Sequence, residues 1–271
     1  MCIIITEAGE NHLGDIEIAR KMIDLSKTAG ADYVKFQYYS AEECADTDSE
    51  KEWFKKVQLD LDKIKYLYDC ANTADINFLC TPWDAEKADA LFSLGIRDMK
   101  IASFHIIDHE MLKLVNGKAR RVFMSTGMSS VEEIDAAVTI MNRAELYLLH
   151  CVSEYPLPEE NVNMRTMDFL RDRYHCNVGY SDHTLGILAP LVAVARGAEV
   201  IEKHITLSKT YFGTDHILSA DPLELKILVE YVRKIQVMLG DKEKKITETE
   251  RKSQDFLRHR FSRKQQAAKR I

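Results

Sequence analysis

The sequence lacks the features of several protein classes. Its six cysteines include no CxxC pair, which argues against a zinc ribbon and fits reduced thiols in the cytoplasm. Its formal net charge is -6, without the basic excess of a protein that binds the nucleic-acid backbone. No apolar run approaches the roughly 20 residues that span a bilayer, and CIIIT near the start is too short for a signal-peptide core. We therefore expect a cytoplasmic protein that binds neither nucleic acid nor membrane.

A glycine-rich phosphate loop is also missing where an open α/β sheet would need one. The first apolar run is followed by EAGENHLG at residues 7–14, which does not match GxGxxG. A doubly wound sheet that binds a dinucleotide carries this fingerprint in the turn after its first strand. Its absence favours a closed barrel, the other common architecture of alternating strands and helices.

Eight short apolar runs are present, and amphipathic stretches separate them. The runs lie at residues 3–6, 33–37, 78–81, 99–103, 121–126, 146–151, 177–183 and 200–205. Stretches such as IEIARKMIDLSKTAG carry apolar residues at the spacing of a helix packed on a core. Strand and helix, repeated eight times, predict a (β/α)8 TIM barrel at residues 1–240. We expect the charged residues 241–271 to form a helix or a linker.

The predicted strands end in polar residues. A barrel of this kind places its functional groups at the carboxyl ends of its strands and in the loops that follow. In chain order these ends carry Glu7, Lys35 with Gln37, Thr81, Lys100 with Ser103, Ser125, Ser153 with Tyr155, Ser181 with His183, and Glu202 with His204. Almost every strand therefore delivers a polar side chain to the same rim.

Two of these residues, Lys35 and Lys100, lie late in apolar strands. One such lysine could extend its ammonium group to solvent, and nearby hydroxyls could merely satisfy the local backbone. Two are harder to explain in this way, because a buried ammonium group is costly without an anionic partner. Lysines, hydroxyls and backbone amides together can bind a phosphate or a carboxylate, so the sequence predicts an anionic ligand.

The last predicted strand reads IEKHIT at residues 201–206. Because strand side chains alternate, Glu202 and His204 face one side and Lys203 the other, where it needs no catalytic explanation. His183 ends the preceding strand, so its imidazole can converge with that of His204. Two histidines and a carboxylate suit manganese, iron or zinc with positions left open. Satisfied core histidines are the alternative interpretation.

Together these segments resemble the sialic acid synthases, which join phosphoenolpyruvate to an N-acylated mannosamine-type sugar. The resemblance covers roughly residues 3–225 and implies the same barrel, a nonulosonic acid product and a homodimer. The matching segments, in the family's order, are EAGENHLG, AGADYVKFQ, FLCTPWD, MKIAS, STGMSS, LLHCVSEYPLP, GYSDHTLG, IEKHIT and FGTDHILSADP.

The resemblance also implies a role for each matching residue. His183 and His204 would bind manganese, with magnesium or cobalt as alternatives. Glu7 would help to hold the sugar and act in acid-base chemistry, Glu202 would contact the sugar, and Lys100 would complete the catalytic group while holding phosphoenolpyruvate. The residues matched to substrate binding are Lys35, Gln37, Thr81, Ser103, Ser125, Ser153, Tyr155, Ser181 and Asp215.

The sequence departs from the family pattern in several places. Ser103 is followed by Phe104 and His105, where family members commonly have glycine and an acid. The chain also stops where the family's small antifreeze-like domain would begin, so we expect a barrel without it. Two other functions stay open: a Schiff-base pyruvate aldolase with Lys100 or Lys35 as nucleophile, and a non-catalytic barrel that binds a sugar acid.

Overall fold

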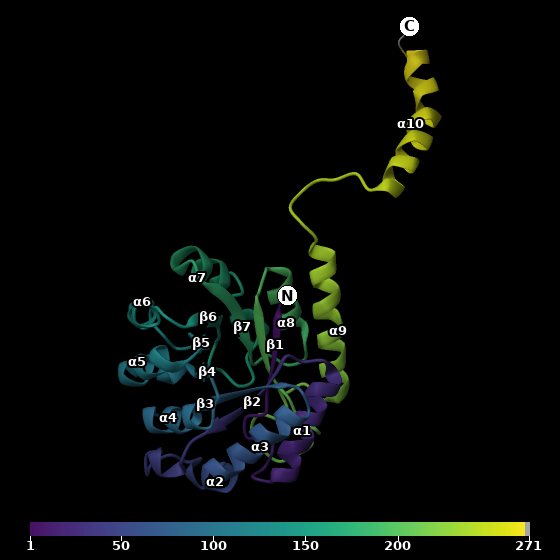
Figure 1. Ribbon diagram of the computed structural model, residues 1–271. Helices are drawn as coiled ribbons and strands as arrows, with labels where there is room; N and C mark the ends of the chain where they lie inside the picture. Colours follow the sequence, from purple (N-terminus) through teal and green to yellow (C-terminus); the bar gives the residue numbers. More distant parts are fainter. Residues whose placement is uncertain (269–271) are drawn as a thin grey trace. The chain divides into compact units, whose positions relative to one another are not determined.

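The chain forms a closed barrel of parallel strands (Figure 1). The computed structural model describes residues 1–268, with the backbone alone for residue 259 and from residue 261 onward. The strands neighbour one another in the order of the sequence, and β8 pairs with β1 to close the barrel. Their bounds are β1 (Ile3–Glu7), β2 (Tyr33–Tyr38), β3 (Asn77–Pro82), β4 (Asp98–Ile101), β5 (Arg121–Ser125), β6 (Glu145–His150), β7 (Asn177–Asp182) and β8 (Val200–His204). Each coincides with a predicted apolar run, so the predicted (β/α)8 barrel is confirmed.

Helices connect the strands, and local sequence signals set their ends. The Asp15 side chain caps α1 by accepting hydrogen bonds from two backbone N–H groups. The same helix ends at Gly30, whose φ of 86° is a left-handed conformation that glycine adopts readily. The helices are α1 (Ile16–Ala29), α2 (Lys51–Val57), α3 (Leu61–Thr73), α4 (Ala85–Ser93), α5 (His109–Lys118), α6 (Val131–Ile140), α7 (Thr166–Tyr174), α8 (Leu188–Ala195) and α9 (Pro222–Leu239), with short 3-10 turns η1 (Ala41–Glu43), η2 (Ser103–His105) and η3 (Glu159–Asn161).

The internal contacts divide the chain after Met238. The first unit is the barrel, and the second begins at Leu239 and contains α10 (Glu248–Ala268). Side chains from residue 241 to residue 258 are mostly exposed. The charged segment expected at residues 241–271 therefore lies in the second unit, and residues 269–271 of it are outside the described part of the chain.

Inward-pointing side chains of the barrel form an apolar layer below a polar one. The register aligns Glu7 with both Lys35 and His204, and Ser181 with Glu202. Because strand side chains alternate, the residue two positions before each of these also faces the barrel interior. The apolar layer consists of Ile5, Tyr33, Leu79, Phe123, Tyr147, Leu149 and Val200. The register therefore gathers the polar strand ends on one rim.

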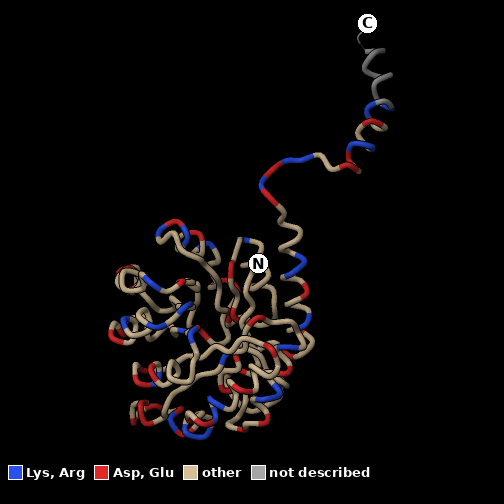
Figure 2. The backbone as a smooth tube through the Cα atoms, in the orientation of Figure 1, with Lys and Arg blue, Asp and Glu red and all other residues tan. Residues whose placement is uncertain are grey.

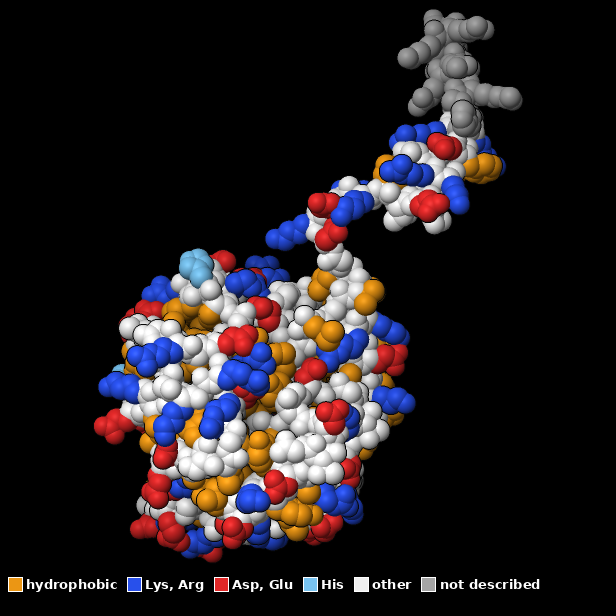
Figure 3. Space-filling model, in the orientation of Figure 1, with side chains coloured by type: hydrophobic (Ala, Val, Ile, Leu, Met, Phe, Trp, Pro, Cys, Tyr) orange, Lys and Arg blue, Asp and Glu red, His pale blue; other side chains and the backbone are white. Residues whose placement is uncertain are grey.

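Outside the barrel interior, positive and negative side chains are mixed along the helices. Figure 2 shows Lys and Arg interspersed with Asp and Glu along the surrounding helices. On the barrel face seen in Figure 3, hydrophobic side chains lie between the charged ones and along α9, where Val237 and Met238 are exposed. No helix within the described residues is long and apolar enough to cross a membrane. The charges that matter for the site are thus the buried ones at the strand ends.

Lys203 points out of the barrel, as predicted, but it is almost fully buried. Its Nζ lies 2.6 Å from Asp182 Oδ2 and donates to the carbonyl of Thr184 at 2.6 Å. Asp182 also accepts hydrogen bonds from the Tyr180 hydroxyl and the Thr184 N–H, each at 3.0 Å. The ion pair therefore ties β7 to β8 on the outer side of the sheet.

Removing the ammonium group should destabilise the barrel. We expect Lys203→Met to lower the free energy of unfolding by about 3 kcal/mol, because it leaves the Asp182 carboxylate buried without its counter-charge. Urea unfolding followed by circular dichroism measures this. Arg20→Ala, which removes exposed ion pairs on α1, is the control and should leave the midpoint unchanged. An unchanged midpoint for Lys203→Met would contradict the assigned role.

Candidate active site

The carboxyl ends of the strands surround a cavity with a volume of about 490 Å³. Every site residue predicted from the sequence lines it. Those residues are Glu7, Lys35, Gln37, Thr81, Lys100, Ser103, Ser125, Ser153, Tyr155, Ser181, His183, Glu202, His204 and Asp215. The structure therefore brings together in one place a set of side chains that the sequence spreads over all eight strands and their loops.

A buried charge network forms the floor of this cavity. Lys35 makes an ion pair with Glu7, and its Nζ also lies 3.8 Å from Glu202 Oε1. Lys100 Nζ lies 3.6 Å from the same Glu202 oxygen. All four side chains are at most 5% exposed. Two ammonium groups and two carboxylates thus share a space that water hardly reaches.

Burial and mutual charge shift the pKa values in this network. Burial opposes the charge of Lys35, but the carboxylates of Glu202 and Glu7 outweigh it and raise the Lys35 pKa. Burial also opposes ionisation of Glu202, whose pKa the two ammonium groups nevertheless hold well below its usual range. Lys100 differs, because burial and the nearby Lys35 charge lower its pKa despite the Glu202 carboxylate.

Hydroxyl groups surround the lysines, and not all of them are satisfied. Thr81 Oγ1 accepts from Lys35 at 3.2 Å, and Ser103 Oγ accepts from the Gly127 N–H at 3.1 Å. Ser125 Oγ and Glu202 Oε2 are buried without a hydrogen-bond partner among the described residues. Buried polar atoms normally have partners, so these two atoms indicate space for a polar ligand.

The two predicted metal-binding histidines converge on the other side of the cavity. Their ring centroids are 5.6 Å apart, and the Tyr155 ring lies against His183 at 4.0 Å. His183 Nδ1 lies 2.7 Å from the Val152 carbonyl oxygen. Because a carbonyl oxygen only accepts, this nitrogen carries a hydrogen, and Nε2 is the atom through which the neutral ring could bind a metal. His204 Nδ1 lies 3.3 Å from Asp215 Oδ2.

The residues present fit a divalent metal with few protein ligands. His204 Nδ1 is buried and has no hydrogen bond within the described chain. In that same part of the chain, no group of three or more His, Cys, Asp or Glu side chains is arranged to hold a metal ion. Two neutral imidazoles would therefore supply the protein ligands, and water or substrate would complete the coordination.

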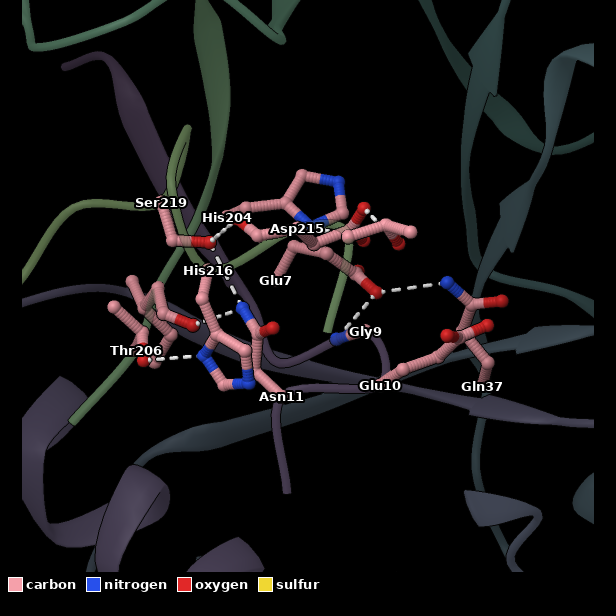
Figure 4. A network of polar contacts seen from close by, with 12 residues as sticks. Glu7, Gly9, Glu10, Asn11, Gln37, His204, Thr206, Asp215, His216 and Ser219 are labelled. Atoms are coloured by element: carbon pink, nitrogen blue, oxygen red, sulfur yellow. Dashed lines mark hydrogen bonds and ion pairs between the residues drawn. The ribbon is translucent and has the colours of Figure 1, made fainter. Parts of the chain in front are cut away.

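The Glu7 carboxylate is oriented by three separate parts of the chain. Its Oε1 accepts from the Gly9 N–H at 2.8 Å and from Gln37 Nε2 at 3.1 Å (Figure 4). The Trp83 indole N–H in turn donates to Gln37 Oε1 at 3.2 Å. Gly9 has a φ of 51°, and a side chain there would meet the His204 ring at 3.2 Å. The close approach of this turn to the histidine therefore requires glycine.

Several cavity residues were not predicted from the sequence. They come from the segments that follow every strand except β7, and no strand or helix periodicity indicated that they face the cavity. The one available signal was for Glu10, which is a polar residue inside the EAGENH turn. The missed residues are Glu10, Glu50, Phe54, Trp83, Phe104, Met128, Cys151 and Thr214.

His105, one of the departures from the family pattern, lies beside the cavity and does not line it. It belongs to η2, and its ring contacts Phe104 at 4.2 Å and Trp83 at 6.4 Å between ring centroids. Burial lowers its pKa. His105 therefore joins an aromatic cluster, and its neighbour Phe104 is the side chain that reaches the cavity wall.

A second hollow, of about 360 Å³, lies at the opposite ends of the strands. The buried carboxylate that lines it, Asp98, is already bound by two nitrogens of Arg120 at 2.6 and 2.9 Å and by the Tyr33 hydroxyl at 2.6 Å. A carboxylate with this many partners has little capacity left for a ligand. The polar groups that could bind a ligand therefore lie at the carboxyl ends of the strands.

Comparison with known proteins agrees with this geometry. Residues 22–244 match the NeuB family. The chain belongs to this family. NeuB family members condense phosphoenolpyruvate with a sugar to make nonulosonic acids, so the predicted relation to sialic acid synthases is confirmed.

Relatives in the NeuB family are named for different nonulosonic acids. An N,N'-diacetyllegionaminic acid synthase of Campylobacter jejuni is 40% identical over 94% of this chain and 83% of its own length. A pseudaminic acid synthase of the same species is 32% identical over 96% and 81%. The solved N-acetylneuraminic acid synthetase of Leptospira borgpetersenii has a TM-score of 0.90 and 36% identity, with 95% and 91% covered.

The histidine pair yields a direct test. We expect the protein to bind Mn²⁺, and His183→Ala and His204→Ala each to weaken that binding at least about 100-fold, since even residues that only orient metal ligands cost 10–100-fold. Calorimetric titration with Mn²⁺ measures the affinity. His216→Ala is a matched control, because this buried histidine contacts Thr206 outside the cavity. Unchanged affinity in the His204 variant would remove the pair from the metal site.

Proposed function

We propose that the protein is a metal-dependent cytoplasmic synthase that condenses phosphoenolpyruvate with an N-acylated mannosamine-type sugar, releasing phosphate and a nonulosonic acid. One observation carries the proposal: two buried ammonium groups and an unbonded hydroxyl share a cavity with a converging histidine pair. The family relation supports the same reaction class. The homodimer expected from the sequence stays a prediction.

The lysine side of the cavity suits phosphoenolpyruvate. This substrate carries both a phosphate and a carboxylate, and charge-assisted hydrogen bonds from ammonium groups bind such oxygens strongly. Lys35 and Lys100 would supply the charge. Thr81, Ser103, Ser125 and Ser181 would supply hydroxyl contacts, and Gln37 and Ser153 line the same wall. The buried and unpartnered Ser125 hydroxyl is free to donate to a substrate oxygen.

The acceptor sugar would lie on the histidine side. Tyr155 and Asp215 line this part of the cavity, and Glu202 lies between it and the lysines. A divalent metal held by His183 and His204 would supply Lewis acidity toward the aldehyde of the open-chain sugar. Manganese is the metal we propose, with magnesium or cobalt as alternatives.

The proposed reaction requires a group that accepts a proton, and Glu7 is the candidate. Carbon 3 of the enol attacks the aldehyde carbon, and a water molecule adds to carbon 2. Glu7, held in place by Gly9 and Gln37, would accept a proton from that water, and the former aldehyde oxygen takes up one proton to become a hydroxyl. The tetrahedral intermediate then collapses by cleavage of its carbon–oxygen bond to phosphate, which takes the remaining proton of the added water and leaves the keto acid. Lys100 would stabilise the negative charge of the departing phosphate.

Phosphate release tests the proposal. We expect release from phosphoenolpyruvate only when Mn²⁺ and an acceptor are both present, across N-acetylmannosamine and 2,4-diacetamido trideoxy hexoses, with the nine-carbon product detected by mass. His204→Ala should reduce the rate to background. His216→Ala should keep it, because that residue lies outside the cavity. Binding of phosphoenolpyruvate without release for any sugar would contradict the synthase and favour a sugar-acid-binding barrel.

A Schiff-base aldolase is the second candidate, because the lowered pKa of Lys100 makes its amine more available as a nucleophile. Lys100 is, however, paired with Glu202 and surrounded by groups suited to phosphate. We therefore expect borohydride treatment in the presence of pyruvate to leave the protein mass unchanged. A covalent adduct that disappears in Lys100→Met would overturn the synthase mechanism in favour of the imine route.

A further inference from the structure

Trp83 follows β3 and lines the cavity, but its indole nitrogen is bonded within the protein. The indole N–H donates a hydrogen bond to Gln37 Oε1 at 3.2 Å, and the backbone N–H donates to the Tyr38 carbonyl oxygen at 3.2 Å. Gln37 lies near the end of β2, and its Nε2 donates to Glu7 Oε1, at the end of β1, at 3.1 Å (Figure 4). The side-chain hydrogen bonds therefore run across the carboxyl ends of β3, β2 and β1.

The indole N–H determines which way the Gln37 amide faces. An indole nitrogen only donates, whereas a glutamine amide has an oxygen that accepts and an NH₂ group that donates. Because Trp83 binds the oxygen, the amide presents its NH₂ group to the Glu7 carboxylate. Without the indole N–H the amide could rotate by half a turn, and its oxygen would then repel the carboxylate. Trp83 therefore favours the one amide orientation that binds Glu7.

The Trp83 ring is itself held by aromatic packing. It stacks on the buried Tyr39 ring with 4.3 Å between ring centroids. The rings of Phe54, on α2, and Phe104, on η2, meet it edge to face at 5.7 and 5.3 Å. A ring packed by neighbours from separate segments has few orientations available, so the direction of its N–H is constant.

We propose that Trp83 is a positioning residue for Glu7 and acts through Gln37. The inference rests on the proposed function, in which Glu7 accepts a proton from the water that adds to carbon 2. Without the Gln37 contact, Glu7 would keep its bond to the Gly9 N–H and its ion pair with Lys35, so the carboxylate would be displaced and not lost. A displaced proton acceptor slows the chemical step and leaves substrate binding largely unchanged.

Steady-state phosphate release by the Mn²⁺-loaded protein tests the kinetic consequence. Trp83→Phe keeps an aromatic ring at the cavity wall and removes the N–H. We expect it to lower kcat by about fivefold, the effect of one hydrogen bond, and to change KM for phosphoenolpyruvate less than about twofold. Gln37→Met should lower kcat at least as much. In the Gln37→Met background, Trp83→Phe should lower kcat no further, because the group through which it acts is already gone.

Trp53→Phe is the matched control, because it removes an indole N–H from the other tryptophan, whose partner is Glu10 and not Gln37. Whatever its own effect on kcat, that effect should be the same with and without Gln37→Met. The inference is wrong if the effects of Trp83→Phe and Gln37→Met on kcat multiply, or if Trp83→Phe raises KM and leaves kcat unchanged.

Hydrogen exchange measures the same contact without turnover. The Gln37 side-chain amide protons can be assigned in ¹⁵N spectra by their loss in Gln37→Met. We expect these protons to exchange with water about fivefold faster in Trp83→Phe than in the parent, because the amide then leaves its bonded orientation more often. Unchanged exchange would overturn the inference. Absent phosphate release from the parent would contradict the proposed function alone, since the exchange measurement still tests the role of Trp83.

Discussion

The structure depends on a buried arrangement of two ammonium groups and two carboxylates inside a barrel. Lys35 and Lys100 could not remain charged there without Glu7 and Glu202, because an unpaired buried charge is too costly. The parallel register aligns Glu7 with Lys35 on neighbouring strands, and Glu202 of β8 approaches both lysines across the barrel interior. The apolar layer beneath excludes water from one side. A reactive polar site and a stable barrel interior are therefore two consequences of the same strand alignment.

The fold could be predicted because periodicity alone defines its repeating elements. Each apolar run became a strand, and the outward orientation of Lys203 followed correctly from alternation along β8. The segment after β2 was harder to anticipate, since η1 and α2 are short and polar. Their positions depend on contacts between distant residues, such as the stacking of Tyr39 on Trp83 at 4.3 Å. Such contacts leave no periodic trace in the sequence.

Much of the candidate site could also be predicted, because a barrel fixes where strand ends meet. The lysines, the histidines and Glu202 needed only the alternation rule and the order of the strands. Trp53 and Trp83 could not be found in this way, since each acts through a partner in a different loop: Glu10 for the first and Gln37 for the second. Likewise, the sequence around Ser103 did not indicate that the His105 ring packs within an aromatic cluster.

Charge balance links the two sides of the cavity. The lysines are already matched by Glu7 and Glu202, so they cannot by themselves neutralise a substrate that brings a phosphate and a carboxylate. The carboxylates are also held by other groups, Glu7 by Gly9 and Gln37 and Glu202 by Ser181. Additional positive charge must therefore accompany the anion into a site this dry. A divalent cation at the histidine pair would provide it, so charge balance supports the proposed metal dependence independently of the chemistry at the aldehyde.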